Sequence, residues 1–574
     1  MTFIRHDGQP ALRPAARLAD VRAYAPPTPR WAIDLRLDAN EGPAPTDPVL
    51  DEVRGVDAED LRRHPDARPL ERDIADAWRI DANRVVVTNG GDDAIDRVCR
   101  AFLEPGCELL MHAPSFEMIP RSARLAGADV RMIGWQVGEF PEAALCDAIT
   151  STTGVVALVT PNNPTGGVID AGMIARIADR AREVGAVVLL DLAYVEFAET
   201  DPTGGVLGRD NVVVVRTFSK ALGLAGMRVG YAIAPVEVAP WLRAAGGPYP
   251  VSSVSLAAAR RAWADRTTAK QLGIVCDERA RLIKLCAELD LEPLPSQANF
   301  VTIRSRRAAW IYEALGSLGI SVRLLKVDGE NPWCRITLPG CAAKFEGLAK
   351  ALRAAGNPQA ILFDLDGVLA DVSGSYHATI IRTASEFGIT LTADDVSREK
   401  ANGNANNDWV LTWRLLAARG ADVSLEAVTR VFQRIYLGDA GVPGLRESER
   451  LIPSRAWLEA IRRCLPLAVV TGRPRDEAAW LLDRFGVRDC FETLVAMEDA
   501  PAKPSPEPVV LALQRLGITR AWMIGDTPDD AVAARAAGVV PIGITAPGDG
   551  PGTLERAGVA RVLEDLSRLE ELLP

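Results

Sequence analysis

Residues 211–220 read NVVVVRTFSK, an apolar β-branched run that ends in a lysine. Similar short runs precede it at VVVT (85–88), VVALVT (155–160) and AVVLLD (186–191), separated by stretches rich in Ala, Leu and Arg. Such runs are typical of parallel strands that are buried on both faces and joined by crossover helices. The sequence therefore predicts an α/β fold, and we expect ligand-binding residues just after each strand.

The same pattern starts again after AAGNPQ (354–359), with ILFDLDG, LAVVTG and WMIGD. A chain of 574 residues is too long for one hydrophobic core, which stops growing near roughly 250–300 residues. We expect two domains, residues 1–355 and 356–574. The second should have core segments at 359–371 and 454–574, with a mostly helical insert at about 372–453.

The composition is that of an ordinary globular protein, with 48% hydrophobic and 25% charged residues. A formal charge of −11 argues against nucleic acid as a partner, since nucleic-acid binders concentrate Lys and Arg. No apolar stretch approaches the roughly 18 residues of a membrane span. Residues 1–20 lack the apolar run of a signal peptide, so we expect a cytoplasmic protein that acts on small molecules.

Lys220 is a candidate to form an imine with an aldehyde cofactor. Asp191 ends the run AVVLLD, where it could pair with a pyridinium nitrogen and make the ring an electron sink. Tyr194 and Asn163 could both hydrogen-bond the ring's phenolic oxygen. Phe116 could stack on the ring face. Together these groups predict a pyridoxal 5'-phosphate site.

A cup for the cofactor's phosphate is predicted at the turn that follows VVVTN. Gly91 and Asp92 open an amphipathic stretch there, and the start of a helix offers free backbone N–H groups to a phosphate. Thr217, Ser219 and Arg228 would complete the cup. Each element also has a plainer interpretation: Asp191 and PNNPTGG (161–167) as turns, and Phe116 as core.

The ordered set resembles the fold-type-I aminotransferases, and specifically the histidinol-phosphate aminotransferase family. The resemblance covers about residues 15–354 and rests on LDANEGP (37–43), RRHPD (62–66), GGDD (90–93), PNNPTGG, DLAY (191–194), TFSK (217–220), PYPVSS (248–253), PSQANF (295–300) and CRIT (334–337). It implies a large sheet domain with a small α/β domain, and ping-pong transamination with glutamate and 2-oxoglutarate as the second pair. It also implies a homodimer.

The resemblance assigns further residues. Asn40 would lie at the substrate entrance, and Arg335 would hold an anionic substrate group with help from Arg323. A guanidinium suits both a carboxylate and a phosphate, although a surface ion pair is the plainer interpretation of Arg335. Three positions depart from the family: His64 replaces a tyrosine that reaches the partner's cofactor phosphate, Phe116 replaces the ring-stacking tyrosine, and Leu192 replaces an acidic residue. These changes leave the substrate open.

In the second domain Asp364 and Asp366 follow an apolar run, and side chains at i and i+2 project to the same side of a strand. The motif resembles the haloacid-dehalogenase (HAD) superfamily, a Rossmann-like fold with a helical cap, whose other motifs match Thr471, Lys503 and Asp526 to Asp530. The resemblance implies that Asp364 attacks phosphorus while Asp366 exchanges the proton. Mg²⁺ would be held by Asp364, Asp366, Asp526 and Asp530, while Thr471 and Lys503 bind the phosphoryl oxygens. A turn is the plainer interpretation of LDLDG alone.

The two resemblances together predict a bifunctional enzyme that transaminates a phosphorylated amino compound and hydrolyses a phosphate monoester. Histidinol phosphate is the expected substrate of both steps. Three alternatives stay open: a paralogue acting on another amino compound, an amino-acid-phosphate decarboxylase, and a non-catalytic cofactor-binding or scaffold protein. A transaminase needs a keto-acid acceptor and a decarboxylase releases CO₂ without one, whereas a scaffold protein turns over neither substrate.

Overall fold

The structure is a computed structural model that describes residues 15–18, 21, 23–25, 28–265, 268–327, 329, 331–401, 407–439, 441–545 and 552–573. Most of the N-terminal stretch 1–20 lies outside the described residues. The chain divides by packing into two compact units. The first unit comprises Met1–Pro27, Leu37–Ser305 and Arg323–Phe345, and the second comprises Thr28–Arg36, Arg306–Val322 and Glu346–Pro574.

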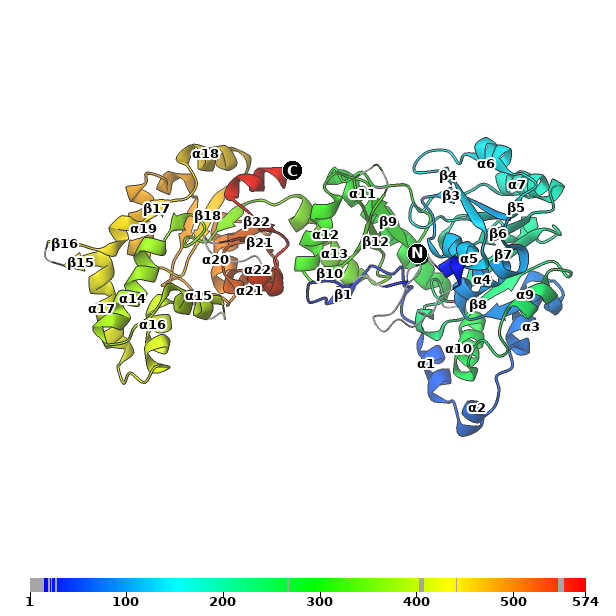
Figure 1. Cartoon of the computed structure of the whole chain (residues 1–574), viewed down its shortest axis with the longest axis horizontal. Helices are drawn as coiled ribbons and strands as arrows, with labels where there is room; N and C mark the ends of the chain where they lie inside the picture. Colours follow the sequence, from blue (N-terminus) through cyan, green and yellow to red (C-terminus); the bar gives the residue numbers. More distant parts are fainter. Residues whose placement is uncertain are drawn as a thin grey trace, which may run out of the picture. The chain divides into compact units, whose positions relative to one another are not determined.

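A seven-stranded sheet forms the centre of the first unit (Figure 1). The strand order is β2-β8-β7-β6-β5-β3-β4, and the strands pair in parallel except that β8 runs antiparallel to β2 and β7. The strands are β2 (Val85–Thr88), β3 (Glu108–Ala113), β4 (Asp129–Gly134), β5 (Thr153–Val159), β6 (Val187–Asp191), β7 (Val212–Thr217) and β8 (Gly230–Ile233). The four predicted strands are thus confirmed.

Both faces of this sheet are buried, which explains its continuous apolar runs. Along β6, Val188 and Leu190 join one hydrophobic cluster, and Val187 and Leu189 join another. Successive strand residues point to opposite faces, so the two clusters lie on the two sides of the sheet. Residues of α3, α7 and α10 complete the first cluster, and residues of α4, α5 and α9 complete the second.

The helices of the first unit connect these strands and flank the sheet. They are α1 (Asp47–Arg54), α2 (Ala58–Arg62), α3 (Arg68–Trp78), α4 (Gly90–Phe102), α5 (Met118–Ala126), α6 (Glu142–Ala148), α7 (Ala171–Glu183), α8 (Thr203–Val206), α9 (Ala239–Ala245), α10 (Ser253–Ala264) and α11 (Thr268–Glu288). A small antiparallel sheet of order β11-β12-β9 is built from β9 (Phe300–Ile303), β11 (Arg323–Leu325) and β12 (Trp333–Thr337).

The second unit contains a fully parallel sheet of order β19-β18-β13-β20-β21-β22. Its strands are β13 (Ile361–Phe363), β18 (Leu467–Val470), β19 (Thr493–Val495), β20 (Trp522–Gly525), β21 (Val540–Ile544) and β22 (Val562–Leu563). β13 lies between β18 and β20, so the residues after these three strands share one edge of the sheet. That edge is where the predicted phosphoryl site should lie.

The helices of the second unit fall into an insert and a core set. α14, α16 and α17 gather to one side of the parallel strands in Figure 1. The helices are α12 (Ala308–Ser317), α14 (Ala378–Glu386), α15 (Ala393–Ala401), α16 (Asp408–Ala417), α17 (Leu425–Leu437), α18 (Arg455–Cys464), α19 (Arg475–Arg484), α20 (Glu507–Leu516), α21 (Pro528–Ala536) and α22 (Gly552–Ala557), while α13 (Ala342–Gly356) spans both units.

Short strands complete the second unit. They form the pairs β14 (Ala370–Asp371) with β17 (Arg450–Leu451), β15 (Gly438–Asp439) with β16 (Val442–Pro443), and β1 (Leu35–Arg36) with β10 (Ile320–Ser321). The β14–β17 pair brackets the predicted cap insert.

Within the described ranges no helix has the length and apolar character needed to cross a bilayer.

Tryptophans within the second unit pack across the sequence position where we predict the domain boundary. Trp310 of α12 meets Trp522 of β20 edge to face, with ring centres 4.8 Å apart, and both are buried. Trp31 donates from Nε1 to the carbonyl oxygen of Val559 over 2.9 Å and lies against Gly316, where a Cβ would come within 2.3 Å of its ring. Segments far from residues 356–574 in sequence are therefore part of the same packed unit.

Candidate active sites

Lys220 follows β7 at the carboxyl edge of the large sheet. Its Nζ donates to the carbonyl oxygen of Ala39 over 3.1 Å and lies 5.6 Å from the centre of the Tyr194 ring. Burial and the positive charge of Arg335 lower the pKa of Lys220 to about 8. The neutral, nucleophilic form of this amine is therefore far more populated near neutral pH than that of an ordinary lysine, whose pKa is about 10.4.

Asp191 is the last residue of β6, the strand next to β7, and it is only 4% exposed. Its Oδ1 accepts a hydrogen bond from the backbone N–H of Ala193 over 3.0 Å. Burial raises the pKa of Asp191 to about 7. A buried carboxyl of this kind binds a cationic partner strongly, which suits the predicted pairing with a protonated ring nitrogen.

Asn40 is buried and holds Tyr194 in place. Its Nδ2 donates to the Tyr194 hydroxyl oxygen over 3.0 Å, and its Oδ1 accepts from the Thr337 hydroxyl over 3.0 Å. Asn40 has φ of 52°, a left-handed conformation that asparagine tolerates better than most residues. Burial raises the pKa of Tyr194 to about 12, so its hydroxyl keeps its proton at neutral pH.

Arg335 is buried, so it is no surface ion pair. Its Nη1 donates to Oδ1 of Asn163 over 2.5 Å, and its Nη2 donates to the carbonyl oxygen of Asp38 over 2.8 Å. Because Oδ1 accepts from Arg335, the amide nitrogen is the end of Asn163 that can donate to another group, as its predicted role requires. Arg323 lies directly opposite Arg335 on the neighbouring strand β11.

The first turn of α4, which begins at Gly90, lies where we predict the phosphate cup. Gly90 has φ of +81°, and a Cβ there would lie 2.7 Å from Nη2 of Arg228. A Cβ on Gly230 would lie 2.5 Å from the backbone of Gly90. Arg228 contacts Oδ2 of Asp92 over 3.1 Å and Oγ of Ser219 over 3.4 Å. The glycines therefore let the start of α4 and a guanidinium approach each other closely.

Other predicted residues lie around or beside this cup. Gly91 packs against Thr217, whose Oγ1 accepts from the backbone N–H of Ser219 over 3.1 Å. Phe116 is half-buried against the hydrophobic cluster that includes α4 and α5. His64 stacks on Tyr249 with ring centres 4.5 Å apart, and it lines a surface hollow of about 530 Å³ between α1, α2 and α10. The stacking of Tyr249 on His64 was not predicted from the sequence.

The second site lies at the carboxyl edge of the parallel sheet. Asp364, Thr471 and Asp526 directly follow β13, β18 and β20, which are adjacent strands. Nζ of Lys503 donates to Oδ1 of Asp364 over 2.5 Å and forms an ion pair with Asp530. Burial alone would lower the pKa of Lys503, but these two carboxylates raise it above its usual value. Burial raises the pKa of Asp364 to about 7, against the opposing effect of Lys503.

Three carboxylates converge as a metal site requires. Asp364, Asp526 and Asp530 each offer an oxygen, and these oxygens lie within 4.8 Å of one another. Gly367, with φ of +74°, permits this arrangement, because a Cβ there would lie 1.9 Å from Oδ2 of Asp526. Carboxylate oxygens are the ligands that Mg²⁺ prefers.

Asp366, also a predicted metal ligand, is not one of the three residues whose oxygens converge, and its Oδ1 accepts a hydrogen bond from Nε of Arg473 over 2.7 Å. Sequence reasoning missed Arg473. The only sequence signal was its position two residues after Thr471, whose Oγ1 accepts from the Arg473 backbone N–H over 3.1 Å.

Residues 45–352, more than half of the chain, match the family of class I and II aminotransferases. The chain belongs to this family. Residues 358–538 match the haloacid dehalogenase-like hydrolases, so an aminotransferase is followed on the same chain by a HAD-like domain. The two matches lie on either side of the predicted boundary near residue 355.

Several proteins similar to this chain are named for their action on histidinol phosphate or imidazoleglycerol phosphate. The chain is 34% identical to a histidinol-phosphate aminotransferase of Jannaschia sp. over 57% of this chain and 94% of that protein. It is 43% identical over 227 residues to an imidazoleglycerol-phosphate dehydratase of Phytophthora nicotianae, of which it covers only 50%. The histidinol-phosphate aminotransferase of Sinorhizobium meliloti, solved with pyridoxal-5'-phosphate, aligns with a TM-score of 0.52 and 25% identity over 56% of this chain and 92% of that one.

Proposed function

We propose that this chain is a bifunctional enzyme that transaminates a phosphorylated amino compound with pyridoxal 5'-phosphate and hydrolyses a phosphate monoester with Mg²⁺. The observation that carries the first activity is the pair of Lys220 and Asp191 on adjacent strand ends. An amine with a pKa of about 8 and a buried carboxyl are what an aldehyde cofactor with a pyridine ring needs.

Several features of the first site fit this cofactor. The close approach of Gly90, Gly230 and Arg228 suits a phosphate, and Asn163 and Tyr194 are donors for a phenolic oxygen. When bound, pyridoxal 5'-phosphate supplies an electron sink for the substrate's α-carbon. Lys220 Nζ then accepts and returns the α-proton, Asp191 keeps its negative charge beside the ring nitrogen, and Asn40 orients Tyr194.

We propose histidinol phosphate as the amino substrate, with glutamate and 2-oxoglutarate as the second pair. The names of the similar aminotransferases support this choice. The cross-strand pairing of Arg323 with Arg335 also supports it, because a bound anion relieves the repulsion between like charges at opposite positions of a sheet. A guanidinium binds a carboxylate or a phosphate through two parallel hydrogen bonds, as an enzyme that alternates between the two substrates requires.

For the second activity, Asp364 attacks phosphorus and forms an aspartyl phosphate while the alcohol leaves. Asp366 gives its proton to the alcohol and then takes one from the hydrolytic water. Thr471 and Lys503 bind the phosphoryl oxygens. Mg²⁺ held by Asp364, Asp526 and Asp530 would neutralise charge between the carboxylates and the phosphoryl group. We further propose a homodimer in the cytoplasm, by analogy with the aminotransferase family.

The proposed function is tested by incubating the purified chain with L-histidinol phosphate, pyridoxal 5'-phosphate and Mg²⁺, with and without 2-oxoglutarate. We expect glutamate to form only with 2-oxoglutarate, and inorganic phosphate to be released in both reactions. Phosphate release from generic esters without glutamate would favour a paralogue with another amino substrate. CO₂ release from an amino-acid phosphate without a keto acid would favour a decarboxylase.

A further inference from the structure

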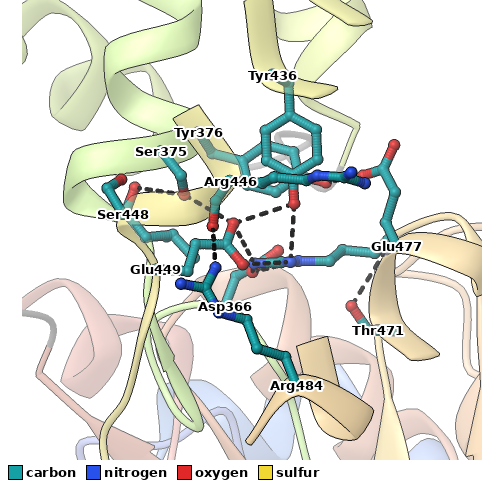
Figure 2. Close-up of polar contacts among 12 residues, drawn as sticks. Asp366, Ser375, Tyr376, Tyr436, Arg446, Ser448, Glu449, Thr471, Glu477 and Arg484 are labelled. Carbon is teal, nitrogen blue, oxygen red and sulfur yellow. Dashed lines mark hydrogen bonds and ion pairs between the residues drawn. The ribbon is translucent and has the colours of Figure 1, made fainter. Parts of the chain in front are cut away.

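A buried network of charged and aromatic side chains surrounds Asp366. Asp366, Glu449 and Tyr436, which Figure 2 shows close together, each hydrogen-bond the guanidinium of Arg473. The ring of Tyr376 packs against the same guanidinium. Tyr376, Tyr436 and Glu449 belong to the predicted cap insert, whereas Asp366 and Arg473 belong to the predicted core. The network therefore joins the two parts of the second unit at one carboxylate.

Arg473 contacts a single oxygen of Asp366. Its Nε donates to Oδ1 over 2.7 Å, and its Nη2 lies 2.5 Å from the same atom. A guanidinium fixes the position of a carboxylate closely, because its donors are held in one plane. Since both contacts use Oδ1, the second oxygen, Oδ2, is left for proton exchange with the substrate.

Arg473 is itself held from the cap side. Its Nη1 lies 3.0 Å from Oε2 of Glu449 and 3.1 Å from the Tyr436 hydroxyl oxygen, and its guanidinium lies 4.6 Å from the centre of the Tyr376 ring. Glu449 accepts further hydrogen bonds from Tyr436, over 3.0 Å, and from Ser375, over 2.8 Å. The side chains of Arg473 and Glu449 are 1% and 0% exposed.

The number of side chains that hold Arg473 in place indicates that this arginine orients Asp366. A buried ion pair stabilises a fold little more than an apolar pair of the same volume, because removing both charges from water costs as much as their attraction returns. Stability alone does not call for three charged groups here. Orientation of a proton-exchanging carboxylate does call for them, since proton transfer requires heavy atoms held about 2.6–3.2 Å apart.

We propose that Arg473 is the positioning residue of the phosphatase site, and that Glu449 of the cap fixes Arg473 so that Oδ2 of Asp366 faces the leaving oxygen. This inference rests on the proposed phosphatase function. In the first step a bond forms between Asp364 and phosphorus, the bond from phosphorus to the leaving oxygen breaks, and Oδ2 gives its proton to that oxygen. In the second, water oxygen bonds to phosphorus, the Asp364–phosphorus bond breaks, and Oδ2 takes the water proton.

The inference is tested by comparing esters that differ in their need for a proton. p-Nitrophenyl phosphate releases a stable anion, whereas phenyl phosphate releases a poorer leaving group that benefits from protonation. We expect Arg473→Lys and Arg473→Met to slow the first turnover of phenyl phosphate about 10- to 100-fold, and that of p-nitrophenyl phosphate only slightly. The phosphorylated enzyme should accumulate with p-nitrophenyl phosphate, because its hydrolysis also needs Asp366.

Arg484→Lys is the matched control. Arg484 of α19 also reaches the cap, where it donates to the carbonyl oxygen of Glu447 over 2.9 Å, but its contacts do not include Asp366. We expect this variant to keep wild-type rates on both esters. Glu449→Gln should reproduce the Arg473 pattern more weakly, because Arg473 stays in place with one charge partner fewer.

The possible results distinguish a failure of the positioning role of Arg473 from a failure of the proposed phosphatase function. An equal slowing of both esters by the Arg473 variants would mean that the residue supports the fold only, and the inference would be overturned. The p-nitrophenol released in the first turnover reports that each variant is folded. A wild-type chain that hydrolyses neither ester would overturn the proposed phosphatase function together with the inference.

Discussion

Arg323 and Arg335 lie directly opposite each other on the antiparallel strands β11 and β12. Like charges in this position destabilise a sheet. Arg335 has two fixed contacts, to Asn163 and to the Asp38 backbone, whereas Arg323 is 4.0 Å from Glu117 and partly exposed. Arg335 is therefore buried and oriented, whereas Arg323 lies closer to solvent. This arrangement is suited to binding an anion between the two arginines.

Replacing Arg335 should weaken both amino substrates. We expect Arg335→Ala to raise KM for glutamate and for the phosphorylated amine by about 10- to 100-fold, which corresponds to the loss of a charged hydrogen bond worth about 1.5–3 kcal/mol. Arg323→Ala should have a smaller effect because its side chain is partly exposed. Steady-state kinetics on each substrate is the measurement, with Arg304→Ala as a control outside the β11–β12 pair. Unchanged KM values for both substrates would contradict the anion-binding role.

The lowered pKa of Lys220 predicts how cofactor uptake depends on pH. Only the neutral amine attacks the aldehyde, so the rate should rise with pH and level off above about 8, whereas an ordinary lysine would need a pH above 10. Stopped-flow absorbance of the cofactor-free protein mixed with pyridoxal 5'-phosphate gives this profile.

A variant checks the cause of that shift. Burial is the main reason for the low pKa, and the charge of Arg335 adds to it. Arg335→Met should therefore move the midpoint to higher pH without bringing it to the value of a free lysine. Lys220→Arg, which cannot attack the aldehyde, should lose the absorbance change altogether. A wild-type midpoint near 10.5 would contradict the buried environment.

The strand ends were predictable from the sequence, but their cross-connections were not. Apolar runs such as 155–160 and 211–216 predict buried parallel strands. The ends of adjacent parallel strands lie at one edge of the sheet, so Asp191 and Lys220 are expected there for any loop conformation. The contact between Arg473 and Asp366 joins residues 107 positions apart through loops. The hydrophobic periodicity of the sequence does not predict a side-chain contact of this kind, so the contact is found only in the structure.

The two activities should be separable at the nucleophile of the second site. Asp364→Asn removes the attacking carboxylate and one ligand of the acidic cluster, so phosphate release should fall by about 1,000-fold or more. Glutamate formation should persist, since Lys220 and Asp191 belong to the other unit. The exposed Asp476→Asn serves as the control. Loss of both activities in Asp364→Asn would mean that the units fold or function together.

Chelation gives a second check on the same separation. Treatment with EDTA should abolish phosphate release and leave transamination intact, and added Mg²⁺ should restore the phosphatase. Phosphatase activity that survives exhaustive chelation would contradict a metal role for Asp364, Asp526 and Asp530.

Tryptophan packing within the second unit predicts that cutting the chain near residue 357 will not release the phosphatase part. Trp310 and Trp522 each donate from Nε1 to a carbonyl oxygen at the end of α13, Ala355 and Ala354 respectively, while their rings meet edge to face. Ion pairs reinforce this contact, namely Arg561 with Glu313 and Arg535 with Asp34. Residues before and after the cut are thus held together without the peptide bond.

A protease site inserted between Asn357 and Pro358 tests this. After cleavage, we expect both fragments to elute together on size exclusion and to separate only in denaturant. Trp310→Ala should release them at moderate dilution, because truncating a buried tryptophan costs about 3–5 kcal/mol. The exposed Trp241→Ala should leave the cleaved pair intact. If the wild-type fragments separated as soon as they were cut, the tryptophan contact would be too weak to fix the phosphatase core against α12, and the predicted boundary near residue 355 would mark an independent domain.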